Sequence, residues 1–229
     1  MGTGELIAAG VGVGDEVVLP SYGGEPTARV LRAMGAVPVF ADIDANSYCL
    51  DPASVEAVAT ERTAAVVPVH LFGHPADMVC LHELAQRRGV RIVEFDDPLV
   101  RVPSADAVRR QQCAAYLDAR LTGVIPPYVA QGVEHSYEQY VVRVPGNGRP
   151  DRDAFKRALR ARGVSCHVPI QTPAHRTREF RADVWLPETE RAADQSLALP
   201  IQASMTRREL QRIVSACNAL GGLLMEPAC

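Results

Sequence analysis

The first hundred residues alternate short apolar runs with stretches of helical length, and this alternation is the strongest constraint on the fold. The apolar runs are rich in β-branched residues and lie at residues 16–20, 37–43, 64–70 and 91–95. Runs of this length between helical stretches are typical of strands that are buried on both faces of a parallel sheet. Because parallel strands need crossover connections, the pattern predicts βαβ units and an α/β fold.

Helix signals fall between these runs, where the crossovers are required. Asp51 followed by Pro52 predicts a helix that begins with an N-cap and a proline in its first turn. A second helix is predicted from Asp77 to Gly89, a glycine of the kind that ends helices. Local helix signals and strand periodicity therefore indicate the same fold class.

The pattern changes near residues 98–104, where two prolines flank a Val-Arg-Val stretch. Beyond this break we expect a smaller α+β unit, because helices now alternate with short strands of antiparallel character. Its expected elements are helices at residues 104–121, 151–163, 187–198 and 206–220, and strands at 135–144 and 165–170. The sequence thus predicts a large α/β domain at residues 1–103 and a small α+β domain at residues 104–229.

Composition excludes several other classes of protein. Hydrophobic residues make up 47% and charged residues 22% of the chain, which is typical of a globular protein. A net charge of -3 gives no attraction for nucleic acid, and no apolar run is long enough to span a membrane. The six cysteines show neither a CxxC motif nor a Cys/His metal spacing, so we expect reduced thiols, no metal and a cytoplasmic location.

Six stretches, taken in order, resemble the DegT/DnrJ-type sugar aminotransferases. They are GVGVGDEVVLPSY, GAVPVFADIDANSYCLDPASVEA, RTAAVVPVHLFGHPADM, VRIVE, GVEHSYEQYVVRVPG and LPETERAADQSLALPIQASMT. This family consists of pyridoxal-phosphate enzymes that act on nucleotide-linked keto sugars. The resemblance implies a reduced aspartate-aminotransferase-type fold, with a mostly parallel sheet and a small C-terminal α+β unit.

Two departures from the family pattern concern residues that hold the cofactor. In the family, the strand that resembles RIVE is followed by an aspartate that contacts the pyridine nitrogen, whereas here Glu94 is followed by Phe95. Asp96 and Asp97 come one and two positions later, and a shift by one residue turns a strand side chain to the opposite face. Gly24 stands where the family has an aromatic residue that stacks on the cofactor. The resemblance therefore implies a weakened cofactor site.

The resemblance also implies that the catalytic lysine is missing. Ten residues separate Pro98 from Arg109, where the family places the remaining strands of the large domain and its cofactor-binding lysine. The one lysine of this chain, Lys156, is predicted on the polar side of a helix. With Arg152 and Arg160, each four residues away, it forms the pattern of a solvated cationic stripe. We therefore expect no pyridoxal phosphate, no other cofactor and no aminotransferase activity.

Two histidines lie at the end of the third apolar run, where an open α/β sheet binds its ligands. His70 matches the family and could equally be a structural histidine that bonds a loop carbonyl. His74 follows four residues later, at a position where the family carries glutamine. Without a cofactor, both are candidates for general acid/base catalysis.

Three carboxylates lie at the end of the next apolar run, namely Glu94 within the run and Asp96 and Asp97 after it. Clustered carboxylates raise one pKa and thereby create a proton donor near neutral pH, although a solvated acidic loop is the alternative. His167 completes the candidate set, because it lies in a strand that faces the active site in the family. The adjacent Cys166 must face the other way, since neighbouring strand residues alternate.

Two functions remain open from the sequence. The first is a pyridoxal-phosphate-independent enzyme of bacterial natural-product metabolism, built on a degenerate sugar-aminotransferase scaffold, that converts a small molecule by acid/base cyclisation, isomerisation or elimination. The second is a non-catalytic pseudo-aminotransferase that acts as partner or regulator of another biosynthetic enzyme. In either case, a shortened parallel sheet with an uncovered edge predicts a homodimer.

Overall fold

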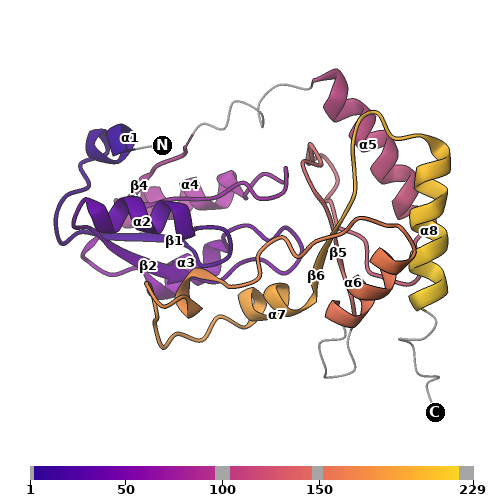
Figure 1. Ribbon diagram of the computed structural model, residues 1–229. Coiled ribbons are helices and arrows are strands. Elements are labelled where there is room, and N and C mark those ends of the chain that lie inside the picture. The colour runs from indigo at the N-terminus through magenta and orange to yellow at the C-terminus, as the bar shows by residue number, and fades with distance from the viewer. Residues whose placement is uncertain (1–2, 96–103, 146–151, 222–229) are drawn as a thin grey trace, which may run out of the picture. The chain divides into compact units, whose positions relative to one another are not determined.

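A computed structural model describes residues 3–95, 104–145 and 152–221 (Figure 1). The chain divides into two compact units, and each takes segments from separate parts of the sequence. Unit 1 comprises residues 1–71, 75–99 and 172–190, and unit 2 comprises residues 72–74, 100–171 and 191–229. The expected boundary at residue 103 therefore does not describe the whole division, because residues 172–190 pack with unit 1.

Unit 1 is built on a four-stranded sheet in the order β2-β1-β3-β4, in which every neighbouring pair is parallel. The strands are β1 (Glu16–Pro20), β2 (Val37–Ala41), β3 (Thr63–Val66) and β4 (Arg91–Ile92). The predicted α/β class and parallel sheet are confirmed. The strands end earlier than expected, because the chain leaves the ladder after Ala41, Val66 and Ile92 and forms loops at the carboxyl edge.

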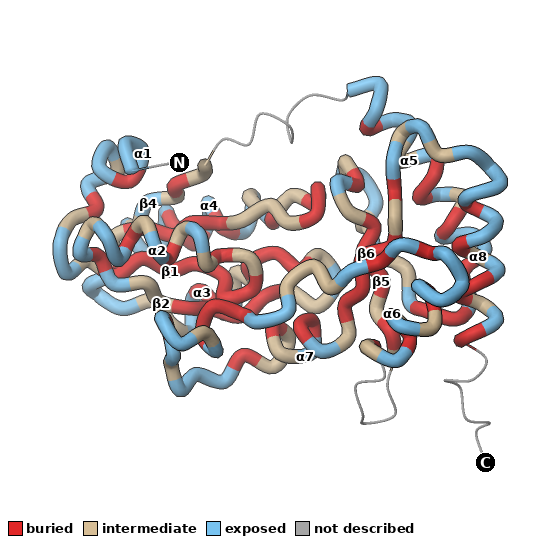
Figure 2. Tube along the Cα trace, viewed as in Figure 1, coloured by how far each residue is buried: buried red, intermediate tan, exposed pale blue. Residues whose placement is uncertain are grey.

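Helices cover both faces of this sheet, and each face has its own apolar cluster. The helices are α1 (Thr3–Ala8), α2 (Glu25–Ala33), α3 (Pro52–Val58) and α4 (Met78–Arg88). Strand β1 alternates, with Val17 and Leu19 in the cluster that includes α2 and Val18 in the cluster that includes α3 and α4. All five residues of β1 are buried, as Figure 2 shows, which is why the strand reads as a continuous apolar run.

The segment 172–190 joins unit 1 through apolar contacts and a helix cap. Ala174, Phe180 and Leu186 belong to the cluster on the α2 face. Buried Asp42 accepts hydrogen bonds from the backbone N–H groups of Glu188 (3.0 Å) and Thr189 (2.7 Å). It thereby caps the start of α7 (Pro187–Gln195) from a position more than 140 residues earlier in the chain. A cap between residues so far apart leaves no local sequence pattern. The predicted boundary therefore does not place residues 172–190 with unit 1.

Unit 2 pairs β5 (Tyr140–Arg143) with β6 (Ser196–Leu199) in antiparallel fashion. Residues 196–198 were expected to continue a helix, and this was wrong, because all four residues of β6 are buried and suit a strand better. The expected strand at 135–144 begins only at Tyr140, since Tyr137 adopts a left-handed backbone with φ 47°. At 165–170 a single bridge between His167 and Ala198 replaces the expected strand.

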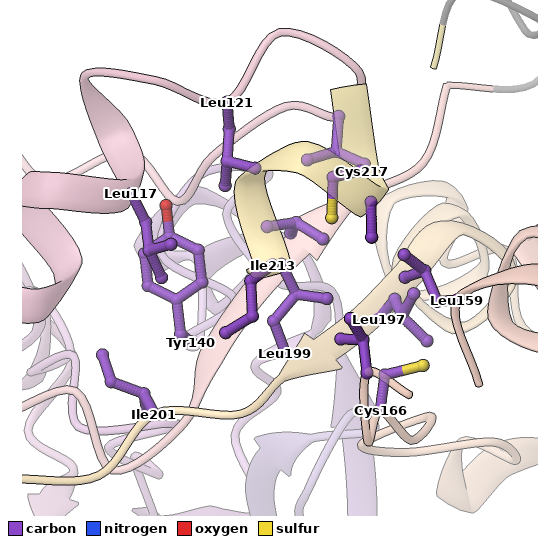
Figure 3. Packing of buried hydrophobic residues seen from close by; sticks show 14 of the residues in the cluster. Leu117, Leu121, Tyr140, Leu159, Cys166, Leu197, Leu199, Ile201, Ile213 and Cys217 are labelled. Carbon is purple, nitrogen blue, oxygen red and sulfur yellow. The ribbon is translucent and has the colours of Figure 1, made fainter. Parts of the chain in front are cut away.

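Three helices pack around this two-stranded sheet, namely α5 (Ala105–Asp118), α6 (Arg152–Ala161) and α8 (Arg207–Gly221). Figure 3 shows Leu117, Leu159 and Ile213 from these helices in the same core as Leu197 of β6. The apolar face of α8 packs in this core, and the helix begins with a capping box in which Thr206 and Glu209 exchange hydrogen bonds. The small α+β unit thus has its own hydrophobic core, which its own helices cover.

The predicted solvated cationic stripe on α6 is wrong for Arg152, whereas Arg160 is exposed as expected. Arg152 is only 7% exposed, and its guanidinium donates to the backbone oxygens of Ala193 (2.8 Å) and Ser196 (3.2 Å). Lys156 is half-buried and lies 3.0 Å from the carboxylate of Asp153. The side of the helix that carries these cations is therefore not free, because Arg152 satisfies the carbonyl groups at the end of α7.

Candidate active site

The carboxyl ends of β3 and β4 bring His70 and Glu94 together. The strands are parallel neighbours, so their following loops emerge at the same edge of the sheet. The Nε2 atom of His70 lies 3.5 Å from Oε2 of Glu94, and the two side chains are 15% and 27% exposed. The pair is therefore sheltered but still reachable from solvent.

A backbone hydrogen bond fixes the tautomer of His70. Its Nδ1 atom accepts from the backbone N–H of Ala76 at 3.0 Å. In the neutral ring the proton must then reside on Nε2, the nitrogen that faces Glu94. The arrangement places an N–H donor 3.5 Å from a carboxylate, which is a unit that can take up and return a proton.

His74 does not join this pair and belongs to unit 2. It is 9% exposed, and its ring meets that of His135 edge to face, with centroids 5.3 Å apart. His135 in turn stacks on Tyr137 at 4.0 Å. The cluster is packed inside unit 2 as part of a buried aromatic group, and sequence reasoning had no signal that separated it from His70.

Burial, together with the neighbouring His74, lowers the pKa of His135 from 6.5 to about 3. Between about pH 3 and pH 6.5, this histidine therefore binds a proton in the unfolded chain but not in the folded chain. The free energy of unfolding should therefore fall as the pH drops below about 6.5, by at most about 1.4 kcal/mol per pH unit for this group. Urea unfolding between pH 7 and pH 4.5 measures the slope.

The matched variants for this pH dependence are His135→Phe and His82→Gln. His82 is exposed on α4, so its replacement should leave the slope unchanged. His135→Phe should reduce the dependence of the unfolding free energy on pH by the contribution of one proton. An unchanged slope in His135→Phe would contradict the neutral, buried state of this ring.

The other candidates lie apart from the pair or outside the described residues. His167 is exposed and belongs to unit 2, while Cys166 beside it is buried in the unit 2 core, as strand alternation requires. Asp96 and Asp97 lie outside the described residues. Of the six candidates, the structure therefore brings together His70 and Glu94.

Sequence reasoning missed a buried network in unit 1 formed by Ser21, His175 and Glu190. The hydroxyl of Ser21 lies 2.7 Å from Nδ1 of His175, whose Nε2 lies 3.3 Å from a carboxylate oxygen of Glu190. Hydrogen bonding from Arg176 lowers the pKa of Glu190, so this carboxylate is ionised. Ser21 and His175 are 154 residues apart in sequence, and no spacing rule connects them.

This network has the composition of a hydrolytic triad but not its accessibility. Ser21 has no exposed surface, and its hydroxyl oxygen also accepts the backbone N–H of His175 at 3.1 Å. A nucleophile must reach the substrate, so the arrangement holds the segment around residue 175 against the end of β1. Beside it lies a cavity of about 840 Å³, whose lining includes His175, Arg176, Arg181 and Glu190.

The fold is α/β, with a mostly parallel sheet and a small α+β unit, and it matches solved structures of pyridoxal-phosphate aminotransferases. Among the described helices, none combines the length and the apolar character that crossing a bilayer requires. The chain belongs to the DegT/DnrJ/EryC1/StrS aminotransferase family, whose sequence model matches residues 4–96 and 98–218. The family is enzymatic, and its curated members include sugar aminotransferases.

Individual relatives support this assignment. The chain is 27% identical over 299 residues to a pleiotropic regulatory protein of Geobacillus stearothermophilus, covering 91% of this chain and 79% of the relative. It is 48% identical over 188 residues to dTDP-3-amino-3,4,6-trideoxy-alpha-D-glucose transaminase of Micromonospora megalomicea, covering 78% and 46%. The crystal structure of DesV from S. venezuelae superposes with a TM-score of 0.84 at 25% identity, covering 95% of this chain and 81% of DesV.

Proposed function

We propose that this chain is a pyridoxal-phosphate-independent enzyme of bacterial natural-product metabolism, in which Glu94, positioned by His70, moves a proton on a keto sugar. The single observation that carries the proposal is the His70–Glu94 pair at the carboxyl end of the sheet, with Nε2 and Oε2 3.5 Å apart. Relatives named as transaminases of nucleotide-linked sugars suggest the substrate class. Cyclisation and elimination use the same acid/base pair, and isomerisation is the simplest of the three reactions.

The described residues do not fit pyridoxal phosphate at this strand end. The chain has one lysine, Lys156, and its ammonium group pairs with Asp153 at 3.0 Å on a helix of unit 2. At Gly24, where the family stacks an aromatic ring, an added Cβ would lie 2.1 Å from the backbone oxygen of Pro20. No side chain fits there without a shift of the backbone. Covalent attachment and ring stacking are therefore both unsupported.

The alignment with the Geobacillus relative supports an internal deletion. It spans 299 positions, whereas 91% of the 229 residues of this chain is about 208, so about 91 aligned positions have no counterpart here. The family match also comes in two segments that meet at residue 97. This is next to the place where the sequence resemblance breaks and where the family carries its catalytic lysine.

The proposed isomerisation balances without a cofactor. The carboxylate of Glu94 takes a proton from the carbon beside the sugar carbonyl, and the electrons of that C–H bond form the enolate. The reaction requires a hydroxyl on the carbon that loses its proton. Return of the proton from Glu94 to the former carbonyl carbon, with transfer of the proton of that hydroxyl to the former carbonyl oxygen, moves the carbonyl to the neighbouring carbon. His70 acts as a positioning residue, because its Nε2–H donor lies 3.5 Å from the carboxylate. The 3.5 Å separation would shorten in the substrate complex.

The test is solvent deuterium exchange into a dTDP-linked keto sugar in D₂O, followed by mass spectrometry. We expect incorporation of deuterium beside the carbonyl at a rate above the uncatalysed exchange, without added pyridoxal phosphate. Exchange that requires pyridoxal phosphate, or none above the uncatalysed rate, would contradict the proposal. In the latter case, a non-catalytic pseudo-aminotransferase that acts as partner or regulator of another biosynthetic enzyme becomes the better description.

A direct test of the cofactor uses absorbance and borohydride trapping. After incubation with pyridoxal phosphate and reduction with borohydride, we expect no stoichiometric label on the folded chain, because Lys156 is engaged by Asp153. Peptide mass spectrometry of the wild type and of Lys156→Arg provides the readout. A stoichiometric adduct at Lys156 that is accompanied by transamination of a keto sugar would overturn the proposed independence from this cofactor.

We also propose a homodimer that covers the β4 edge of the sheet. Strand β4 is the last in the order β2-β1-β3-β4, and an open parallel edge promotes pairing with another chain. Sedimentation at micromolar concentration should give a species of twice the 24.7 kDa chain mass. A single species at the chain mass would contradict the dimer.

A further inference from the structure

Unit 2 carries an open cavity of about 560 Å³ beside α5 and the start of α8. Figure 1 shows these two helices side by side. Helix α5 contributes Arg109, Cys113 and Tyr116, which recur at three- and four-residue spacing and therefore share one helix face. Arg120 follows two residues after the last residue of the helix. The opposite wall comes from residues 203–210, where α8 begins. The cavity is thus lined by elements of a single unit, and none of its residues belongs to the strand-end pair.

The lining is positively charged and contains no carboxylate. Its ionisable groups include Arg109, Arg120 and Arg207, and neither aspartate nor glutamate lines it. Arg120 lies over the ring of Tyr116, with its guanidinium carbon 4.0 Å from the centroid. Across the described part of the chain, Arg109 and Arg207 have neither an acidic nor a hydrogen-bonding side-chain partner. Three like charges around one cavity repel one another, so an anion bound there would remove this repulsion.

In the cavity of unit 1, by contrast, acidic and basic side chains of the lining neutralise each other. There, Glu190 pairs with Arg176 at 2.5 Å, and Asp183 lines the same cavity as Arg181. Two carboxylates thus balance two guanidinium groups. The cavity in unit 2 has no such balance, which is why its charge favours an anionic ligand.

The lining also favours an organic ligand with more than one negative charge. Three guanidinium groups exceed what a single carboxylate can neutralise, and guanidinium matches phosphate geometry with paired N–H donors. Met205, Leu210 and Cys113 add an apolar part to the lining. We infer that this cavity binds a phosphate or diphosphate ester of a small organic molecule, with Arg109 and Arg207 on the phosphate groups. The inference does not depend on the proposed proton transfer.

The test is isothermal titration of the full chain with thymidine diphosphate, inorganic pyrophosphate and uncharged thymidine. Both phosphates should bind and thymidine should not, and the affinity should fall as salt is added. Arg207→Ala and Arg109→Ala should each weaken binding by about tenfold or more, since each removes a charged hydrogen-bond donor.

The matched control is Arg208→Ala, because Arg208 is exposed on the same helix next to Arg207 but does not line the cavity. It should leave the affinity unchanged. Equal losses in Arg207→Ala and Arg208→Ala would show attraction to general positive charge and would overturn the site. Absence of binding by both phosphates at millimolar concentration would overturn it as well. The readout is heat of binding, so this result is independent of deuterium exchange at the His70–Glu94 pair.

Discussion

Replacing Glu94 with glutamine is expected to lower the rate of deuterium exchange into the keto sugar by about 100-fold or more, because a positioned acid or base contributes roughly 10²–10⁴ in rate. Glutamine keeps the size and the hydrogen-bonding oxygen of Glu94 but cannot take up the proton. His70→Gln should lower kcat with little change in KM, since His70 orients the carboxylate rather than the substrate. Steady-state kinetics of the exchange measures both values.

The controls separate chemistry from folding. Glu83→Gln changes an exposed carboxylate on α4, and His167→Gln changes an exposed histidine of unit 2. Both should exchange deuterium at the wild-type rate, and all four variants should melt within a few degrees of the wild type. If His167→Gln lost as much activity as His70→Gln, the assignment of the reaction to the strand-end pair would be wrong.

Replacing Arg152 with methionine is expected to destabilise unit 2 by about 3 kcal/mol, because a buried acceptor left without its donor costs roughly 1–3 kcal/mol. Arg152 is 7% exposed, and its guanidinium holds the backbone oxygens of Ala193 and Ser196. Methionine fills a similar volume but offers no donor to either oxygen. Urea unfolding followed by circular dichroism gives the change in the free energy of unfolding.

Two other cations on α6 serve as controls for Arg152. Arg157 is exposed, so Arg157→Met should change the free energy of unfolding by less than about 0.5 kcal/mol. Lys156→Met removes the partly exposed pair with Asp153 and should cost less than about 1 kcal/mol. Equal stabilities of the Arg152→Met and Arg157→Met variants would mean that water satisfies the carbonyl groups at the end of α7.

Local physics explains which elements the sequence predicts correctly. Asp51, Asp77 and Ser104 accept the backbone hydrogen bonds expected of N-caps, and Gly89 ends α4 in the left-handed conformation. These signals depend on residues within one or two turns, so they can be recognised in the sequence without knowledge of tertiary contacts. The positions at which strands end are harder to predict, because a β-branched residue such as Val67 continues the apolar run after β3 has ended.

Part of the candidate site could also be predicted from local sequence patterns. His70 and Glu94 come together because each follows a strand of one parallel sheet, and the sequence contains both strands. His74 is only four residues from His70 but packs in the other unit, against His135. The sequence therefore predicted parallel strands with both side chains at their ends, but not the direction in which the loop after His70 turns.

The sequence by itself determined the α/β class, the four parallel strands, most helix boundaries and the single lysine. Only the tertiary structure decided that Asp42 caps α7, that Arg152 is buried, and that Ser21 meets His175. The physical reason is the range of the interactions. Periodicity and caps act within a few residues, whereas these contacts join positions far apart in the chain and depend on which backbone groups the fold leaves unsatisfied.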